Sequence, residues 1–198
     1  MNLKQDSHMH NETGFDEMRF VRQIRYHRLG AIGQQKLSEA HAAIVGCGAL
    51  GSTTAMSLTR AGIGRLTIID RDVPEWSNLP RQFLFTEKDV CDGLPKAIIA
   101  EKRLKEIDRN VQVIPHVRDL SAHNISDLLS SVDVIVDGTD NFETRFLVND
   151  FSCRENIPWV YGGVIGAEGR VMAVIPGTTA CLRCLIPEPP APGSLPTC

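Results

Sequence analysis

The stretch HAAIVGCGALGSTTAMSLTRAGIGRLTIID, residues 41–70, decides the fold. It opens with a short apolar run that stops at Gly46, and residues 49–63 follow with helix-compatible spacing and Gly62 near their end. A second apolar run, RLTIID, then ends in an acid. This order predicts a strand, a glycine turn, a helix and a second strand, so the segment from Ala42 to Asp70 has the form of a βαβ unit.

The same alternation continues on both sides of this unit. Residues 15–37 predict a helical N-terminal segment, and residues 71–93 read as a long irregular stretch, of a length that favours a functional role. Beyond it we expect helices at 94–107, 125–132 and 141–156, and strands at 111–117, at 132–138 and twice within 157–177, joined near Gly166 to Gly169. The predicted fold class is therefore α/β and Rossmann-like, a mostly parallel sheet with helices on both faces.

Composition narrows the classes of protein that fit. The chain has 198 residues, 42% of them hydrophobic, with 21 Lys and Arg against 24 Asp and Glu. These values indicate one folded domain and exclude a mainly disordered chain or a strongly basic nucleic-acid binder. No apolar run approaches the roughly 18 residues of a membrane span, and the first residues lack an apolar signal region, so we expect no membrane partner and a cytoplasmic location. We predict a frayed N-terminus at 1–14, a nucleotide-binding domain at 15–186 and a proline-rich tail or truncated crossover loop at 187–198.

The glycine turn carries the first chemical signal. Gly46, Gly48 and Gly51 fit GxGxxG between a predicted strand and a predicted helix, where they allow a tight turn, close approach to phosphates and close helix packing. Asp70, at the end of the next strand, can accept hydrogen bonds from ribose hydroxyls. A plain glycine-rich turn with a capping Asp is the alternative. The fingerprint does not separate NAD from ATP.

Polar residues nearby favour ATP. A nucleotidyltransferase needs cations on the phosphates, and Arg22, Arg81 and Lys96 lie in or beside irregular segments or a helix start, with Asn78 in the same loop as Arg81. Each cation alone is more often a solvated surface residue. Asp140 follows a predicted parallel strand, where its carboxylate suits Mg²⁺; the alternative is that Asp140 caps the next helix.

Seven motifs occur in a family-like order and spacing. They are RFVRQI (19–24), GCGALG (46–51), TIID (67–70), SNLPRQ (77–82), GLPK (93–96), DGTDN (137–141) and CLRC (181–184). Over roughly residues 18–198 the chain resembles the HesA/MoeB/ThiF family, bacterial relatives of ubiquitin-activating enzymes.

The resemblance implies an ATP-dependent adenylyltransferase. In this reaction the C-terminal glycine carboxylate of a small ubiquitin-like sulfur carrier ending in Gly-Gly attacks the α-phosphorus of ATP, giving an acyl-adenylate and pyrophosphate. The implied assembly is a homodimer, and the product pathway is sulfur transfer of the molybdopterin or thiamine type. The resemblance implies that Gly46, Gly48 and Gly51 form the nucleotide turn and that Asp70 binds the ribose. It implies that Asn78, Arg81 and Lys96 bind the triphosphate and that Asp140 holds Mg²⁺. It also implies that Arg22 reaches the phosphates bound by the partner subunit.

The cysteines match the family pattern only in part. The spacing of Cys181 and Cys184 suits half of a Cys₄ zinc site, and in the family a second CxxC supplies the other half. No second CxxC follows in these 198 residues, so we expect only a Zn²⁺ half-site; a redox CxxC is the alternative. Cys198 is a further catalytic candidate, since some relatives use a cysteine there for a covalent link to the carrier. Because relatives continue beyond this position, the chain is interpreted as C-terminally truncated.

Two other functions remain open at this stage. An NAD(P)-dependent oxidoreductase would explain the glycine turn and Asp70 but would leave Arg22, Arg81, Lys96 and Asp140 without a role. A non-catalytic nucleotide-binding scaffold of the same fold would be marked by loss of the last three of these residues, and all three are present.

Overall fold

A computed structural model of the chain describes residues 18–188. The N-terminus expected at 1–14, the tail from residue 189 onward and the candidate Cys198 lie outside the described residues. Within 18–188, no helix is long and apolar enough to span a membrane.

Six strands and eight α-helices make up the described chain. The strands are β1 (His41–Val45), β2 (Arg65–Ile69), β3 (Gln112–His116), β4 (Val134–Asp137), β5 (Trp159–Ile165) and β6 (Glu168–Val174). The helices are α1 (Val21–Ile24), α2 (Gly30–Glu39), α3 (Ala49–Ala61), α4 (Glu87–Asp92), α5 (Lys96–Ile107), α6 (Ile125–Leu129), α7 (Phe142–Glu155) and α8 (Leu182–Leu185), with a short 3₁₀ turn, η1, at Trp76–Asn78.

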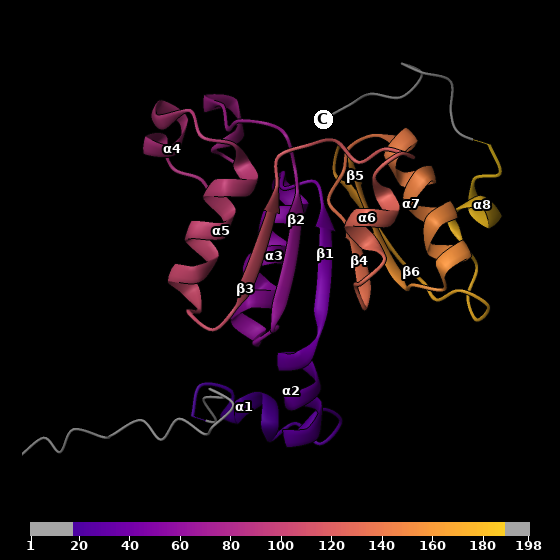
Figure 1. Ribbon diagram of the computed structural model, residues 1–198, viewed down its shortest axis with the longest axis horizontal. Helices are drawn as coiled ribbons and strands as arrows, with labels where there is room; N and C mark the ends of the chain where they lie inside the picture. Colours follow the sequence, from indigo (N-terminus) through magenta and orange to yellow (C-terminus); the bar gives the residue numbers. More distant parts are fainter. Residues whose placement is uncertain (1–17, 189–198) are drawn as a thin grey trace, which may run out of the picture.

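The strands form one sheet in the order β3-β2-β1-β4-β5-β6 (Figure 1). All neighbours pair in parallel except β5 and β6, which form an antiparallel hairpin. The predicted α/β class, the mostly parallel sheet and the final pair of strands are therefore confirmed. The hairpin turns at Gly166, whose φ of +58° is a backbone conformation that glycine adopts readily.

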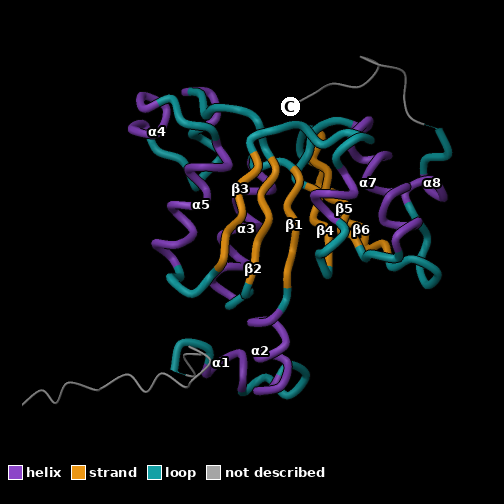
Figure 2. The backbone as a smooth tube through the Cα atoms, viewed as in Figure 1, coloured by secondary structure: helices purple, strands orange, loops and turns teal. Residues whose placement is uncertain are grey.

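The core lies on both faces of the sheet because successive residues of a strand point to opposite sides. In β1, Ala42 and Ile44 join a buried cluster with residues of α3 and α5. Ala43 and Val45 join a second cluster with residues of α6 and α7. Figure 2 shows the sheet between these helices. Strands buried on both faces explain the unbroken apolar runs in the sequence.

The N-terminal segment is helical as predicted, in two short pieces. Two amide side chains bind this segment to the end of α3. Nε2 of Gln23 donates to the Ala61 carbonyl at 2.9 Å, and Nε2 of Gln34 donates to the same carbonyl at 2.8 Å. Gln34 is fully buried. This places α1 and α2 beyond the amino ends of the strands, away from the edge where β1, β2 and β4 end (Figure 1).

The prediction of irregular structure throughout 71–93 is wrong for η1 and α4. Thr86 begins α4 with a capping box, in which the Asp89 carboxylate accepts bonds from the backbone N–H and the hydroxyl of Thr86 at 2.8 and 2.7 Å. Gly93 ends the helix with φ +66°. The usual sequence signal for this cap has Glu or Gln at the third position, and Asp89 serves the same purpose here.

Candidate functional site

The candidate site lies at the carboxyl edge of the sheet. Parallel strands β1, β2 and β4 end there together, and the strand order reverses between β1 and β4. Ligands of open α/β sheets bind in the crevice that such a reversal leaves. The glycine turn, Asp70 and the loop that carries Asp140 follow these three strands.

The glycine turn between β1 and α3 is closed by backbone contacts that leave no room for side chains. Gly46 has φ +87°, and a Cβ on it would lie 2.7 Å from the carbonyl oxygen of Gly138. A Cβ on Gly51 would collide with the carbonyl oxygen of Gly46. At Gly48 the nearest protein atom to a Cβ would be 3.8 Å away. Gly46 and Gly51 thus shape the turn, while Gly48 leaves open space at the start of α3, as a nucleotide phosphate requires.

Asp70 holds this turn directly. Its Oδ2 accepts the backbone N–H of Cys47 at 2.6 Å, and its Oδ1 accepts that of Asp72 at 2.7 Å. Burial raises the pKa of Asp70, and these two N–H groups and the charge of Lys96 oppose the rise. With both oxygens fixed, the remaining lone pairs can face ribose hydroxyls.

Lys96 is a buried cation at the first residue of α5. Its Nζ lies 3.5 Å from Oδ2 of Asp72, and its backbone N–H donates to the carbonyl of Asp72 at 2.7 Å. Its side chain is 7% exposed against 59% for Asp72. Because Asp72 donates its backbone N–H to Asp70, and Asp70 in turn holds the glycine turn, the ammonium of Lys96 lies beside the same site.

The loop that carries Asn78 and Arg81 crosses the same edge. Asn78 is buried, and its Oδ1 accepts the backbone N–H of Glu75 at 3.2 Å within η1. Arg81 is exposed, and its Nη1 donates to the carbonyl of Ser77 at 2.6 Å. The loop therefore offers one fixed amide and one solvent-facing guanidinium.

Gln82 is a site residue that the sequence reasoning missed. It is 4% exposed, and its Nε2 is the nearest protein atom to the open position at Gly48. Its Oε1 is buried without a hydrogen-bond partner among the described residues. A buried acceptor beside an open turn is suited to a ligand donor. The signal available was its position next to Arg81 in SNLPRQ.

Asp140 is exposed in the loop after β4. The alternative that it caps the next helix is wrong, because Asn141 begins α7 and its Oδ1 accepts the N–H of Thr144 at 2.8 Å. The Asp140 carboxylate makes no hydrogen bond or ion pair within residues 18–188, so its oxygens are free to coordinate. In that same part of the chain, no three His, Cys, Asp or Glu side chains gather as a metal site. Mg²⁺ commonly uses one or two carboxylates together with substrate phosphates, and Asp140 fits that mode.

Two groups of predicted residues lie away from this edge. Arg22 is exposed on α1, at the opposite end of the sheet (Figure 1). Cys181 and Cys184 flank the start of α8, beside α7, with their sulfur atoms 3.8 Å apart. A tetrahedral zinc ion with bonds of ~2.3 Å would hold two thiolates about that far apart. The cysteine pair fits a half-site, and its turn is anchored on α7 by a bond from Leu182 N–H to Asn149 Oδ1 at 2.8 Å.

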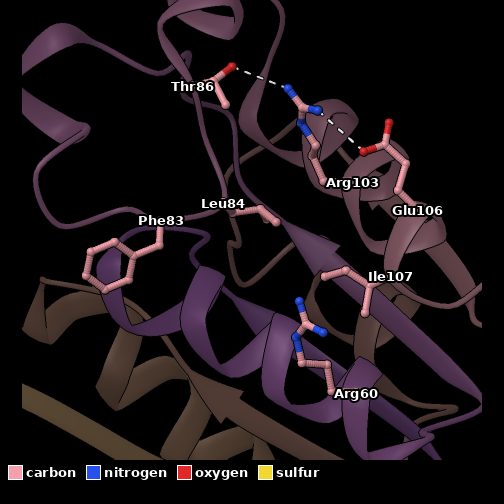
Figure 3. A pocket seen from close by; sticks show the side chains of 7 residues that line it. All are labelled: Arg60, Phe83, Leu84, Thr86, Arg103, Glu106 and Ile107. Atoms are coloured by element: carbon pink, nitrogen blue, oxygen red, sulfur yellow. Dashed lines mark hydrogen bonds and ion pairs between the residues drawn. The ribbon is translucent and has the colours of Figure 1, made fainter. Parts of the chain in front are cut away.

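A shallow pocket of about 430 Å³ lies elsewhere, between α3, α5 and the segment before α4 (Figure 3). Arg60, Phe83 and Arg103 are among its lining residues. Arg103 is already committed, because it donates to the Asp89 carboxylate at 3.1 Å and pairs with Glu106 at 3.4 Å. None of the residues that line this pocket belongs to the glycine turn.

Comparison with known proteins agrees with this geometry. The model of the ThiF family matches residues 20–198. The chain belongs to the ThiF family.

Two relatives of this ThiF-family chain carry names that state an enzymatic activity. It is 48% identical to the sulfur carrier protein ThiS adenylyltransferase of Bacillus subtilis, covering 89% of this chain and 52% of the relative. It is 39% identical to a sulfur carrier protein adenylyltransferase of Thermus thermophilus, over 91% and 68%. The chain thus spans about half the length of the Bacillus relative.

Solved structures extend the ThiF-family comparison to three dimensions. A crystal structure of E. coli MccB with ATP superimposes with a TM-score of 0.77 at 28% identity, over 85% of this chain and 52% of that one. MccB with succinimide gives a TM-score of 0.76 at 29% identity, over 84% and 51%. The Rossmann-like sheet is therefore shared with an ATP-bound relative.

Proposed function

We propose that this chain is the nucleotide-binding part of an ATP-dependent adenylyltransferase that activates the C-terminal carboxylate of a ubiquitin-like sulfur carrier ending in Gly-Gly. One observation carries the proposal: the open glycine turn, the locked Asp70 and the buried Lys96 adjoin at one edge of the sheet. The relatives named as sulfur carrier protein adenylyltransferases support it. We assign residues 15–186 to the adenylation domain and 187–198 to a tail or crossover loop.

The proposed reaction needs positioning and charge neutralisation more than covalent participation by the enzyme. The carrier carboxylate attacks the α-phosphorus of ATP, the bond to the β-phosphate oxygen breaks, and pyrophosphate leaves. Gly46, Gly48 and Gly51 form the nucleotide turn, in which the N–H of Gly46 is bonded to the Ile69 carbonyl and Gly48 leaves open space for a phosphate, and Asp70 binds the ribose. Lys96 is well suited to hold the triphosphate because it is fixed at a helix start, where positive charge from α5 adds to its own.

Asn78 and Arg81 complete the triphosphate site in this proposal. The guanidinium of Arg81 faces solvent and can turn to phosphate oxygens, and a cation there stabilises charge that grows on pyrophosphate. Asp140 is the residue that would hold Mg²⁺. When bound, that ion would neutralise phosphate charge, in line with its usual role.

Arg22 can serve this site only from another copy, since α1 and the glycine turn lie at opposite ends of the sheet (Figure 1). We therefore propose a homodimer in which each Arg22 reaches the partner's phosphates. Cys181 and Cys184 are proposed as half of a Zn²⁺ site, and Cys198 as a candidate for a covalent link to the carrier. A cytoplasmic location stays a prediction.

ATP–pyrophosphate exchange measured with a panel of Gly-Gly-ended carriers tests the function. We expect exchange with at least one carrier and its loss in Asp140→Ala, with an unchanged circular dichroism spectrum. Arg22→Ala should also depress exchange. No exchange with any carrier, together with tight NADH binding, would favour an oxidoreductase. Normal exchange in Asp140→Ala would remove that residue from the mechanism.

A further inference from the structure

Arg145, on the first turn of α7, is a buried cation that the proposed reaction does not use. It is 6% exposed, and its Nε lies 3.1 Å from Oδ2 of Asp137, whose side chain is 2% exposed. The guanidinium also lies 5.3 and 5.2 Å from the ring centres of Phe142 and Tyr161. A buried ion pair is weak evidence for stability, since well-packed apolar residues often serve as well. Its position next to the site therefore calls for another explanation.

The remaining bonds of Arg145 go to the backbone on either side of the site. Its Nη2 donates to the carbonyl of Thr139 at 2.6 Å and to that of Gly162, in β5, at 3.1 Å. The Thr139 carbonyl is part of the peptide group that joins Thr139 to Asp140. Arg145 thus holds the peptide unit immediately before the Asp140 backbone.

Asp137 fixes the same loop from the other side. Its Oδ1 accepts the N–H of Thr139 at 2.8 Å and the Thr139 hydroxyl at 2.7 Å, while its Oδ2 faces Arg145. Burial raises the pKa of Asp137, and the charge of Arg145 opposes the rise. One carboxylate therefore ties the loop backbone to the buried guanidinium.

Asp140 is consequently held between two fixed points. Arg145 binds the peptide before it, and Asn141 after it is the N-cap of α7. The loop is also pressed against the nucleotide turn, because a Cβ on Gly138 would collide with the Gly46 carbonyl. Among residues 18–188 the side chain of Asp140 has no hydrogen-bond or ion-pair partner, so its placement depends on the backbone.

We propose that Arg145 is a positioning residue that sets Asp140 for Mg²⁺ bound with ATP. This inference rests on the proposed function, which assigns Asp140 to the metal. Partners that orient a metal ligand commonly change metal affinity by about 10- to 100-fold when they are replaced. Arg145→Lys keeps the charge but loses the fork that reaches Asp137, Thr139 and Gly162 together.

The test is calorimetric titration of the 198-residue chain with ATP, in EDTA and in excess Mg²⁺. In EDTA we expect the Kd of Arg145→Lys for ATP to lie within about twofold of the wild-type value. The increase in ATP affinity that Mg²⁺ causes should be about tenfold smaller in Arg145→Lys than in wild type. In an Asp140→Asn background, Arg145→Lys should cause no further loss, since both changes act through one group. Arg154→Lys, on the exposed side of the same helix, is the matched control.

The outcomes separate this inference from the proposed function. A wild type that gains no affinity from Mg²⁺ overturns the role of Asp140 and this inference with it. If wild type gains ATP affinity from Mg²⁺ and Arg145→Lys retains that gain, the inference alone is overturned. It is also overturned if Arg145→Lys lowers the affinity further in the Asp140→Asn background. If Arg145→Lys does not melt cooperatively, the paired variant Asp137→Asn/Arg145→Gln replaces it, because it removes the guanidinium fork and leaves no buried charge unpaired. Retention of the Mg²⁺ gain in that variant overturns the inference.

Discussion

Asp70 and Cys47 are joined by a hydrogen bond of 2.6 Å between the carboxylate Oδ2 and the backbone N–H in the middle of the glycine turn. The end of β2 therefore shapes the turn that follows β1. The same carboxylate would receive the ribose, so one side chain both builds the turn and serves the ligand. A substitution at Asp70 should therefore affect both the stability of the fold and the binding of the ligand.

We predict that Asp70→Asn destabilises the fold and weakens ATP binding together. An amide has one acceptor oxygen, so either the N–H of Cys47 or that of Asp72 would lose its partner, at a cost of about 1–3 kcal/mol. The Kd for ATP should rise by about tenfold or more, equivalent to ~1.4 kcal/mol. Urea unfolding and ATP titration measure the two effects. Asp127→Asn, an exposed site on α6, is the control, and an unchanged Kd in Asp70→Asn would contradict the assignment.

Gly51→Ala should destabilise the protein, because the new Cβ would collide with the Gly46 carbonyl. The backbone of the turn must move to relieve the clash, and forcing extra atoms into a packed site costs about 1–3 kcal/mol. Gly169→Ala is the matched control, since nothing lies within 4 Å of a Cβ there. Thermal melting compares the two variants, and equal melting temperatures would show that the turn is not closed as described.

Lys96→Met should lower kcat/KM for ATP–pyrophosphate exchange by about 100-fold, the usual effect of losing one preorganised donor. Methionine keeps the length of the buried side chain and removes the charge. Lys102→Met on the exposed face of the same helix controls for a general change in charge. If both variants exchange at the same rate, Lys96 is a structural residue only.

Stability should fall as the pH drops below about 6.5, in part through His41. Its Nδ1 lies 3.0 Å from the Ser131 carbonyl and its Nε2 2.8 Å from Oγ1 of Thr67. Burial and the charge of Arg65 lower its pKa from 6.5, while Ser131 and Asp133 oppose this. Because the unfolded chain then binds the proton more tightly, the stability from the neutral ring is complete above pH 6.5 and is lost below it.

Urea unfolding between pH 5 and 8 measures this dependence. We expect His41→Gln to flatten the slope of unfolding free energy against pH, and His123→Gln, at an exposed site, to leave it unchanged. His116, whose pKa is lowered by burial and by Arg118, should keep a residual slope of the same sign. An undiminished slope in His41→Gln would contradict the proposed linkage.

The CLRC turn should bind zinc less well when its second contact with α7, the ion pair of Arg183 with Asp150, is removed. Arg183 forms two bonds with Asp150, Nε to Oδ1 at 2.7 Å and Nη2 to Oδ2 at 2.6 Å. Asp150→Asn is expected to lower Zn²⁺ affinity by about tenfold, as loss of an outer partner does. Because this pair is exposed to solvent, it contributes little to stability, so melting should barely change. Competition with a zinc indicator measures the affinity, and Glu155→Gln is the control.

The fold was largely predictable because its signals are local. Unbroken apolar runs, a glycine turn and an amphipathic α5 determine the elements of a parallel sheet, and the switch to an antiparallel pair is marked by Gly166. The capping box at Thr86 was missed because its acceptor is Asp89 instead of the more usual Glu or Gln. Local patterns thus located most elements, and errors arose where a cap used an unusual side chain.

The candidate site was predictable only in part. Residues in motifs were found, whereas Gln82 and Arg145 depend on burial and on partners distant in sequence. The unpaired Oε1 of Gln82 and the bond from Arg145 to Gly162 exist only after the sheet has formed. The N-cap at Asn141 likewise decided against a capping role for Asp140.

The pairing of β1 with β4 has a consequence for synthesis of the chain. His41 and Asp133 are 92 residues apart, yet the N–H of one donates to the carboxylate of the other at the start of these strands. At their far ends Gly138 rests on the glycine turn. On a ribosome, β1 and the turn emerge long before β4 does. The glycine turn therefore stays incomplete until the segment that separates β1 from β4, and Gly138 after it, has been made, so under the proposed function ATP could stabilise the nascent protein only after that point.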